Sequence, residues 1–308
     1  MAIKQEMAAP HIRRKRTTSA IMTDVVIALL PICVWAVWLF RWQAAAVLVT
    51  TTAVCVLADW LCLKLRGRGG FDGSGAVTGL LLGLSLPAGT ALWAAALASV
   101  FAVAVVKQLP GGIGRNLFNP AMAGRALLLV TLPQTLGGYV RPDAVSSATP
   151  IAEAGLDTSL WPLFLGYENG SLGETSALLI LVGMVYLCAR GVIRMRVPIT
   201  CVWSFALVYW IFGGSAPFTG AAAAQLLSGG LLLGAVFMVT DFTSKPTTPV
   251  GECVFAAGVG ILTAVLRIWG PYPEGVCFAI LLMNAAAPLI EWLTMPRVYG
   301  VRIGRHAA

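Results

Sequence analysis

Ten apolar segments, separated by shorter polar stretches, run along most of the chain. A membrane-spanning helix needs about 20 mainly apolar residues, and fewer where it is broken or packed among neighbouring helices. The pattern therefore predicts an all-α integral membrane protein with about ten transmembrane helices. We expect them at residues 21–40, 44–63, 75–86, 91–106, 117–132, 175–189, 197–212, 226–240, 250–269 and 275–292.

The longest polar connection, residues 133–174, divides the chain into two halves with five apolar segments each. A tail (residues 1–20) and the first half (residues 21–132) precede it. The second half (residues 175–294) and a short tail (residues 295–308) follow it. Because each half has an odd number of spans, halves that are structural repeats must lie in opposite orientations in the membrane. We therefore predict two inverted five-helix halves.

The third and eighth apolar segments are short and rich in glycine, and they hold equivalent places in the two halves. Paired broken segments of this kind mark the place where a ligand or ion approaches the backbone near the middle of the membrane. Close helix packing through small residues explains the same composition. Both interpretations stay open from the sequence.

The composition agrees with a membrane protein. Of 308 residues, 58% are apolar and 11% are charged, and the mean hydropathy is +0.84. An ordinary soluble domain has about 25% charged residues, so these values exclude a single water-soluble globule. On so apolar a chain, the net charge of +8 indicates membrane topology rather than a nucleic-acid surface.

The basic residues predict the orientation. With the N-terminus in the cytoplasm, 17 of the 21 Lys and Arg residues lie on the cytoplasmic side. Arg41, Arg141 and Arg267 lie outside, and Arg125 falls within the fifth segment. The positive-inside rule therefore predicts that both termini are cytoplasmic and that residues 133–174 are extracytoplasmic.

The histidines and cysteines indicate no metal centre. His11 and His306 lie in the polar end segments, which excludes histidine ligation of haem or zinc inside the membrane. None of the seven cysteines forms a CxxC pair, and most lie in apolar runs, where cysteine behaves as a small hydrophobe. We expect no metal site supplied by this chain alone.

The external connection contains a hydroxyl-rich stretch with the sequence Asp143-Ala144-Val145-Ser146-Ser147-Ala148-Thr149-Pro150. Local physics predicts a turn, because small hydroxyl side chains compete for backbone hydrogen bonds and Pro150 disfavours helix at Thr149. The stretch also resembles the acceptor motif of a flavin transferase, which joins FMN to the last threonine through a phosphodiester. Ser147 stands where many such motifs have glycine, and serine is within the pattern.

Four further motifs extend the resemblance over nearly the whole chain. They are GIGRNLFNPAM (112–122), GSLGETSA (170–177), TDFTSKPTTP (240–249) and GVCFAILLMN (275–284). Together they resemble the NqrB/RnfD family of membrane redox subunits. The short basic tail favours the D-subunit side of the family, that of the Rnf electron-transport complex, because the B subunits normally have a longer N-terminal extension.

The resemblance implies a membrane flavoprotein with FMN on Thr149, and with Asp143, Ser146 and Ser147 in the motif recognised for modification. It implies a subunit of an ion-translocating ferredoxin:NAD oxidoreductase in the bacterial inner membrane, which passes electrons and couples them to Na⁺ or H⁺ movement. Its partners would be the flavin transferase, the ferredoxin/NAD-side and Fe–S subunits, and a second flavinylated subunit. The chain would not be catalytic alone.

Five polar residues in or beside apolar segments are candidates for a second flavin, such as riboflavin, or for an ion pathway: Asn116, Asn119, Arg125, Asp241 and Asn284. Helix capping explains the first two equally well. Two other functions stay open: a B-like subunit of a Na⁺-pumping NADH:quinone reductase, and a solute channel or carrier with the same inverted fold. The Thr149 motif favours the redox function, because a channel or carrier does not need it.

Overall fold

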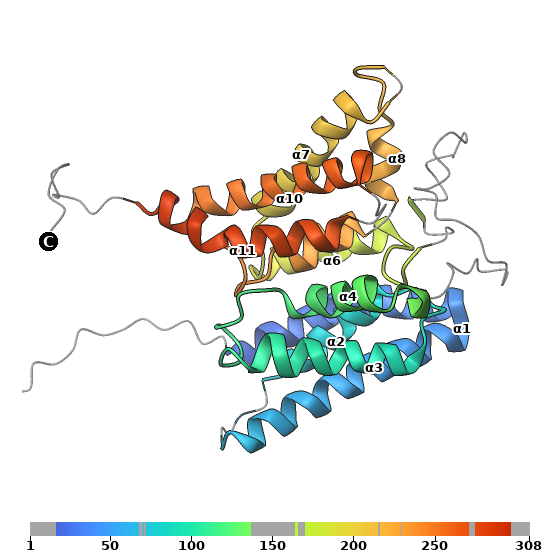
Figure 1. Ribbon diagram of the computed structural model, residues 1–308, viewed down its shortest axis with the longest axis vertical. Coiled ribbons are helices and arrows are strands. Elements are labelled where there is room, and N and C mark those ends of the chain that lie inside the picture. Colours follow the sequence, from blue (N-terminus) through green and yellow to red (C-terminus); the bar gives the residue numbers. More distant parts are fainter. Residues whose placement is uncertain are drawn as a thin grey trace, which may run out of the picture.

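The computed structural model describes residues 17–67, 70, 72–136, 164–165, 170–214, 216–228, 230–270 and 275–296, and these residues form helices and connections without strands (Figure 1). The first half contains α1 (Thr18–Leu65), α2 (Ser74–Ser85), α3 (Leu92–Val100), the π-helix η1 (Phe101–Gln108), α4 (Pro120–Thr131) and the short η2 (Pro133–Leu136). The second half contains α6 (Ala177–Ala189), α7 (Arg196–Phe212), α8 (Ala222–Leu227), α9 (Leu231–Leu233), η3 (Gly234–Met238), α10 (Pro249–Trp269) and α11 (Val276–Thr294).

Every predicted apolar segment coincides with helix in the described part of the chain. α1 contains the first two segments, α3 continues into η1 over the fourth, and α8, α9 and η3 share the eighth. By length and composition, α1, α10 and α11 could cross a membrane. This confirms an all-α membrane protein, whereas the number of spanning helices and the inverted relation of the halves stay predictions.

α1 turns back on itself at Arg41, whose backbone is non-helical with φ 54° and ψ −134°. Residues far apart along α1 approach the same end of α2. A Cβ atom built on Gly73 would lie 3.9 Å from the Cβ of Met22, and one on Gly75 would lie 3.0 Å from the Cβ of Asp59. The two arms of α1 are therefore antiparallel, as two separate predicted segments require (Figure 1).

Glycines let α2 lie directly against the second arm of α1. A Cβ atom on Gly79 would lie 2.5 Å from the Cα of Thr52, and one on Gly83 would lie 2.5 Å from the Oγ1 of Thr51. Real Cβ atoms do not approach other atoms this closely. The glycines of the third predicted segment thus have a packing role.

We expect Gly79→Ala to destabilise the protein by about 1–3 kcal/mol, because the added methyl group must push two helix backbones apart. The thermal unfolding midpoint of the purified protein in detergent would measure this. Ala76→Val is the control, because it adds volume to the same helix at a half-buried position. An unchanged midpoint for Gly79→Ala would contradict the observed helix contact.

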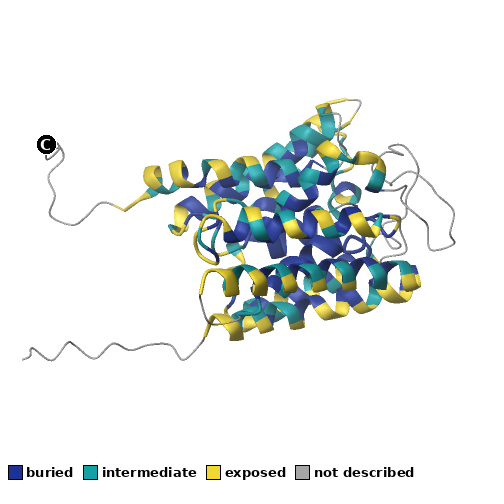
Figure 2. Ribbon diagram, turned by 60° about the horizontal axis from the view of Figure 1, so that its bottom comes forward, coloured by how far each residue is buried: buried dark blue, intermediate teal, exposed yellow. Residues whose placement is uncertain are grey.

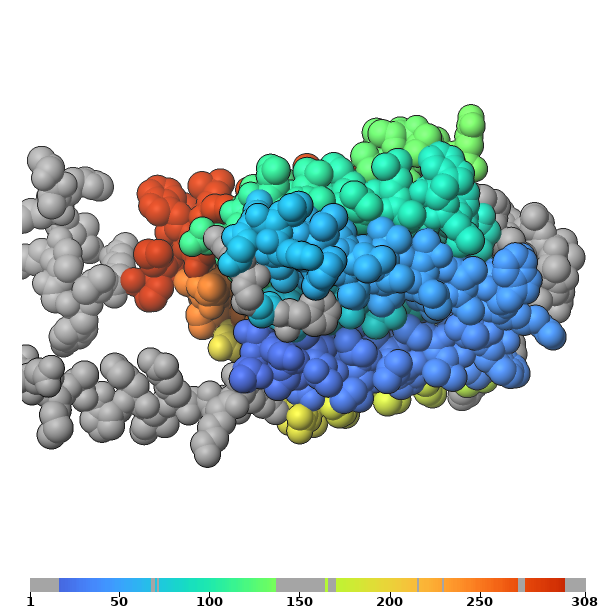
Figure 3. All heavy atoms as spheres, turned by 90° about the horizontal axis from the view of Figure 1, so that it is seen from below, coloured from blue at the N-terminus to red at the C-terminus, as the bar shows by residue number. Residues whose placement is uncertain are grey.

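Buried residues gather between the helices, and exposed residues cover their outer faces (Figure 2). Many exposed side chains are large and apolar, among them Trp38, Trp203 and Trp292, which are 62–71% exposed. Contiguous apolar surface of this kind is unfavourable in water and favourable in contact with lipid. Seen from below, the helices of the first half form a continuous face (Figure 3).

The end of the long polar connection enters the protein interior. Residues 170–176 are all buried. Leu172 donates its N–H to the carbonyl of Leu86 at 3.0 Å, and Gly173 donates to the carbonyl of Leu84 at 2.7 Å. These bonds satisfy the carbonyl groups at the C-terminal end of the short helix α2. The connection predicted as residues 133–174 thus ends in a segment that packs between the two halves.

Candidate functional site

A cavity of about 390 Å³ lies between the two halves, at the end of the bundle where α1 begins. Helices α1, α2, η1 and α4 line it from the first half, and α6, η3 and the connection after η3 line it from the second. Most of its wall is apolar. The polar lining residues are Thr18, Ser74, Thr78, Lys107, Asn116, Asn119, Thr240, Asp241 and Thr243.

Asn119 caps helix α4 on the wall of this cavity. Its Oδ1 accepts hydrogen bonds from the N–H groups of Ala121 (3.0 Å) and Met122 (3.3 Å), and Pro120 occupies the first helical position. This is the arrangement that the capping explanation predicts. The cap fixes the beginning of α4, and with it the place where the first half meets the cavity.

Asn116 lies before the cap and makes a different contact. Its Nδ2 donates to the Oγ1 of Thr243 at 3.1 Å, so it links the first half to the connection after η3. Its buried Oδ1 has no hydrogen-bond partner within the described part of the protein. Buried amide oxygens nearly always accept a hydrogen bond, so this atom is suited to a donor on a molecule in the cavity.

Asp241 organises the connection on the opposite wall. Its Oδ2 accepts hydrogen bonds from the hydroxyls of Thr243 (3.0 Å) and Ser244 (3.1 Å), and its Oδ1 accepts from the N–H of Thr243 at 3.4 Å. Desolvation by the surrounding protein raises the pKa of the Asp241 carboxyl, and these hydrogen bonds oppose the shift. A carboxyl group that binds a proton more readily than usual therefore lines the cavity.

Asn284 supports this wall from behind. In its hydrogen-bonded orientation, its amide donates to the carbonyl of Ser244 at 3.1 Å and accepts from the N–H of Asn119 at 3.0 Å. Four of the five predicted second-site residues, Asn116, Asn119, Asp241 and Asn284, therefore meet at one place. They lie in three separate sequence motifs, and only the fold brings them together.

Arg125, the fifth candidate, does not line this cavity. Its Nη1 lies 3.8 Å from the Oε1 of Glu174, and both side chains are buried. The two residues border a separate void of about 10 Å³, the size of one water molecule. Arg125 thus has the carboxylate partner that a guanidinium inside an apolar segment requires.

Sequence reasoning did not identify Lys107 as a site residue. Its Nζ donates to the Oδ2 of Asp59 at 2.9 Å and to the Oγ of Ser74 at 2.6 Å, and Gln108 donates to the Oδ1 of Asp59 at 2.6 Å. Lys107 is 2% exposed and Asp59 is fully buried. The sequence shows Asp59 within one apolar segment and Lys107 at the end of another. It gives no indication that the two side chains form an ion pair.

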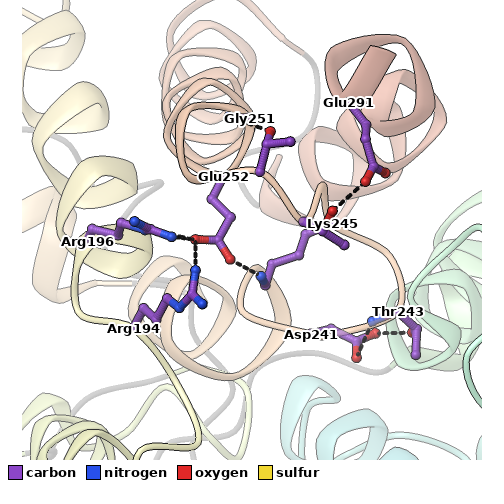
Figure 4. A network of polar contacts seen from close by, with 10 residues as sticks. Arg194, Arg196, Asp241, Thr243, Lys245, Gly251, Glu252 and Glu291 are labelled. Atoms are coloured by element: carbon purple, nitrogen blue, oxygen red, sulfur yellow. Dashed lines mark hydrogen bonds and ion pairs between the residues drawn. The ribbon is translucent and has the colours of Figure 1, made fainter. Parts of the chain in front are cut away.

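A second charged cluster surrounds Glu252 at the start of α10 (Figure 4). Arg196 donates to its Oε2 through Nε at 2.8 Å and also through Nη2, Lys245 donates to its Oε1, and the Nη1 of Arg194 lies 3.5 Å from its Oε2. One buried carboxylate therefore accepts from three cations. A cavity of about 280 Å³, lined by Arg194, Lys245 and Glu252 among others, lies beside this cluster.

The predicted FMN-acceptor residues Asp143, Ser146, Ser147 and Thr149 lie outside the described residues, and their roles stay predictions. The structure describes the two helices that precede them, α4 and η2. α4 begins at the cavity with Pro120 and runs away from it to Thr131, and η2 follows at the other end of the bundle (Figure 1).

Comparison with known proteins gives consistent matches over nearly the full length. The model of the family described as "NQR2, RnfD, RnfE family" matches residues 6–300. The chain is 40% identical over 306 residues to the D subunit of the Na(+)-translocating ferredoxin:NAD(+) oxidoreductase complex of Acetobacterium woodii, covering 96% of this chain and 94% of that one. It is 37% identical over 316 residues to the D subunit of the proton-translocating ferredoxin:NAD(+) oxidoreductase complex of Clostridium ljungdahlii, covering 96% of each. It is 36% identical over 329 residues to the D subunit of the ion-translocating oxidoreductase complex of Stutzerimonas stutzeri, covering 93% of each.

Proposed function

The chain belongs to the NQR2, RnfD, RnfE family, and from this premise we propose that it is the D subunit of an ion-translocating ferredoxin:NAD oxidoreductase complex. Similarity over nearly the whole chain to subunits with this name carries the proposal. In that complex, electrons from ferredoxin pass through this subunit and its partners, and their transfer drives Na⁺ or H⁺ across the membrane. Moving one charge against 100 mV requires about 2.3 kcal/mol.

We further propose that FMN is attached to Thr149 by a phosphodiester bond. The stretch from Asp143 to Thr149, with Ser146 and Ser147, fits the acceptor pattern of a flavin transferase. A threonine in a connection between helices can enter the active site of a second enzyme, which a residue within a packed span cannot do. Bound FMN would supply one- and two-electron transfer, while the protein sets its position and surroundings.

The distribution of charge supports a cytoplasmic location for the cavity and an extracytoplasmic location for Thr149. Several basic residues form ion pairs at the end of the bundle where the cavity lies. Lys107 pairs with Asp59, Arg190 pairs with Asp24, and both Arg196 and Lys245 pair with Glu252. η2, which leads into the connection with Thr149, lies at the opposite end. By the positive-inside rule, the basic end faces the cytoplasm.

Mass analysis of the peptide containing Thr149 tests the covalent flavin directly. The protein must be purified from cells that express the flavin transferase. We expect the peptide that contains residues 143–150 to carry the mass of an FMN phosphodiester, with fragment ions that assign it to Thr149. An unmodified peptide from such cells would contradict the proposal.

The cavity is our proposed site for a second, non-covalent flavin such as riboflavin. Its volume of about 390 Å³ lies in the usual range for small-molecule sites, about 300–1,000 Å³. Its walls are mainly apolar, which suits an aromatic ring system, and its polar lining residues can fix the orientation of a bound molecule. The buried Oδ1 of Asn116 fits a hydrogen-bond donor such as a flavin ring N–H, and Asn119 and Asp241 hold the surrounding walls in place.

We expect Leu81→Trp to fill this cavity and to lower the non-covalent flavin content by about tenfold or more, since a loss of 1.4 kcal/mol in binding is already tenfold. Leu81 lines the cavity and is buried. Quantifying the flavin that acid extraction releases would measure this, with the flavin that stays bound to protein as the internal standard. Leu97→Trp, at an exposed position of α3, is the control. Equal released flavin in both variants would place the second flavin elsewhere.

A further inference from the structure

The cluster around Glu252 carries an excess of positive charge. Arg194, Arg196 and Lys245 contribute three positive charges, and Glu252 contributes one negative charge. The Glu252 side chain is 3% exposed, whereas those of Arg194 and Arg196 are 63% and 35% exposed. The carboxylate thus gathers three cations at one place, and two of them keep N–H groups accessible from outside.

A cavity adjoins these cations. It measures about 280 Å³, and Arg194, Lys245 and Glu252 line it together with Val192, Val197 and Phe242. Arg196 does not line the cavity but shares the Glu252 carboxylate with the two cations that do. Polar and charged residues make up half of the cavity's lining, and the cavity lies next to the proposed flavin cavity, with which it shares Val192, Ile193, Thr240 and Phe242. A cavity lined by two cations and by apolar side chains suits a molecule with an anionic head and an apolar body.

The surface beyond the cluster is apolar and exposed. α7 begins at Arg196, and its following turns expose Ile199 (46%) and Trp203 (70%). α10 likewise exposes Val250 and Val254 beside Glu252. The cations therefore lie at the end of an apolar outer face, and basic residues in this position are suited to the phospholipid headgroups at the edge of the hydrocarbon layer.

We propose that Arg194, Arg196 and Lys245 form a binding site for the phosphate group of an anionic phospholipid, with Glu252 as the residue that positions them. Guanidinium groups bind phosphate oxygens through paired N–H donors, and a lysine adds a point charge. The lipid's acyl chains would lie along the exposed faces of α7 and α10. This site does not depend on the flavins, because neither flavin site uses these three cations.

Three variants with different effects on the charge test the site in the purified complex. Arg194→Gln/Lys245→Gln removes two positive charges from the cluster, Glu252→Gln removes its negative charge, and Arg66→Gln removes a charge outside it. Arg66 is a matched control, because it lies on the first half and donates to the backbone carbonyl of Gln108. The three probes are dihexanoyl phosphatidylglycerol, dihexanoyl phosphatidylcholine and inorganic phosphate, each titrated while the thermal unfolding midpoint is followed.

We expect phosphatidylglycerol to bind about 30-fold more weakly to Arg194→Gln/Lys245→Gln, since each basic residue near the surface contributes about 1 kcal/mol. Glu252→Gln should also bind it more weakly, because the three cations lose the carboxylate that positions them. Arg66→Gln should bind it as the unmodified complex does. Equal binding of phosphatidylcholine, or unchanged binding of phosphatidylglycerol by either of the first two variants, would overturn the proposal. Inorganic phosphate binding as tightly as phosphatidylglycerol would overturn the assignment to a lipid. The flavin content of each variant shows that the complex is intact.

Discussion

Replacing Thr149 with alanine is expected to abolish the covalent flavin completely. A phosphodiester needs a hydroxyl oxygen on the protein, and alanine provides none. The purified protein should give a fluorescent band on a denaturing gel under ultraviolet light, because a covalent bond survives denaturation. In Thr149→Ala that band should be dark at equal protein loading.

The control is Thr158→Ala, which removes another threonine from the same connection and should leave the band fluorescent. Both variants must come from cells that express the flavin transferase. A fluorescent band in Thr149→Ala would assign the flavin to another residue. A dark band from the unmodified protein would contradict a redox function and favour a channel or carrier.

The second large effect is expected at Lys107. Lys107→Met should destabilise the protein by about 3–5 kcal/mol, because it leaves the Asp59 carboxylate buried without its cation. Asp59 is fully buried, and its carboxylate would keep only the neutral hydrogen-bond donor of Gln108. The thermal unfolding midpoint in detergent would measure the loss. The same variant would also remove Lys107 from the lining of the cavity that we propose as a flavin site.

Lys64→Met provides the comparison, because Lys64 lies at the same end of the bundle but is exposed, with its Nζ 4.9 Å from the ring centre of Trp60. Its removal should cost less than about 1 kcal/mol. The double variant Asp59→Leu/Lys107→Met should recover part of the stability, since apolar residues can replace a buried ion pair. If Lys107→Met has the same thermal unfolding midpoint as the unmodified protein, the ion pair between Lys107 and Asp59 does not stabilise the fold.

The apolar segments could be predicted because they depend on each stretch of chain separately. Even the sharp turn at Arg41 falls in the short gap between the first two predicted segments. The burial of the end of the polar connection could not be predicted, because residues 170–176 are rich in Gly, Ser, Glu and Thr, a composition typical of solvent-exposed loops. In the structure they are buried, with their backbone bonded to the end of α2.

The sequence identified most of the polar residues at the candidate site but not how they are arranged around the cavity. Asn116, Asn119, Asp241 and Asn284 were candidates from the sequence, and the capping explanation for Asn119 is confirmed by its two hydrogen bonds to α4. The partners of the charged residues did not follow from the sequence. Lys107 and Asp59 are 48 residues apart, and the cations around Glu252 come from the beginning of α7, the turn before it and the connection before α10.

The sequence by itself determined the all-helical membrane class, the positions of the apolar segments and the family. The free energy of transferring a helix into lipid depends on the residues of that segment alone, so each apolar segment can be recognised without the rest of the fold. The motifs that indicate the family are likewise short stretches of sequence. Only the tertiary structure decided which polar groups meet. It placed the polar residues around the cavity between the halves, paired Asp59 with Lys107 and Glu174 with Arg125, and gathered three cations at Glu252. Burying a charge is tolerated only when a partner lies within a few ångströms, and that distance is set by packing between segments far apart in the sequence.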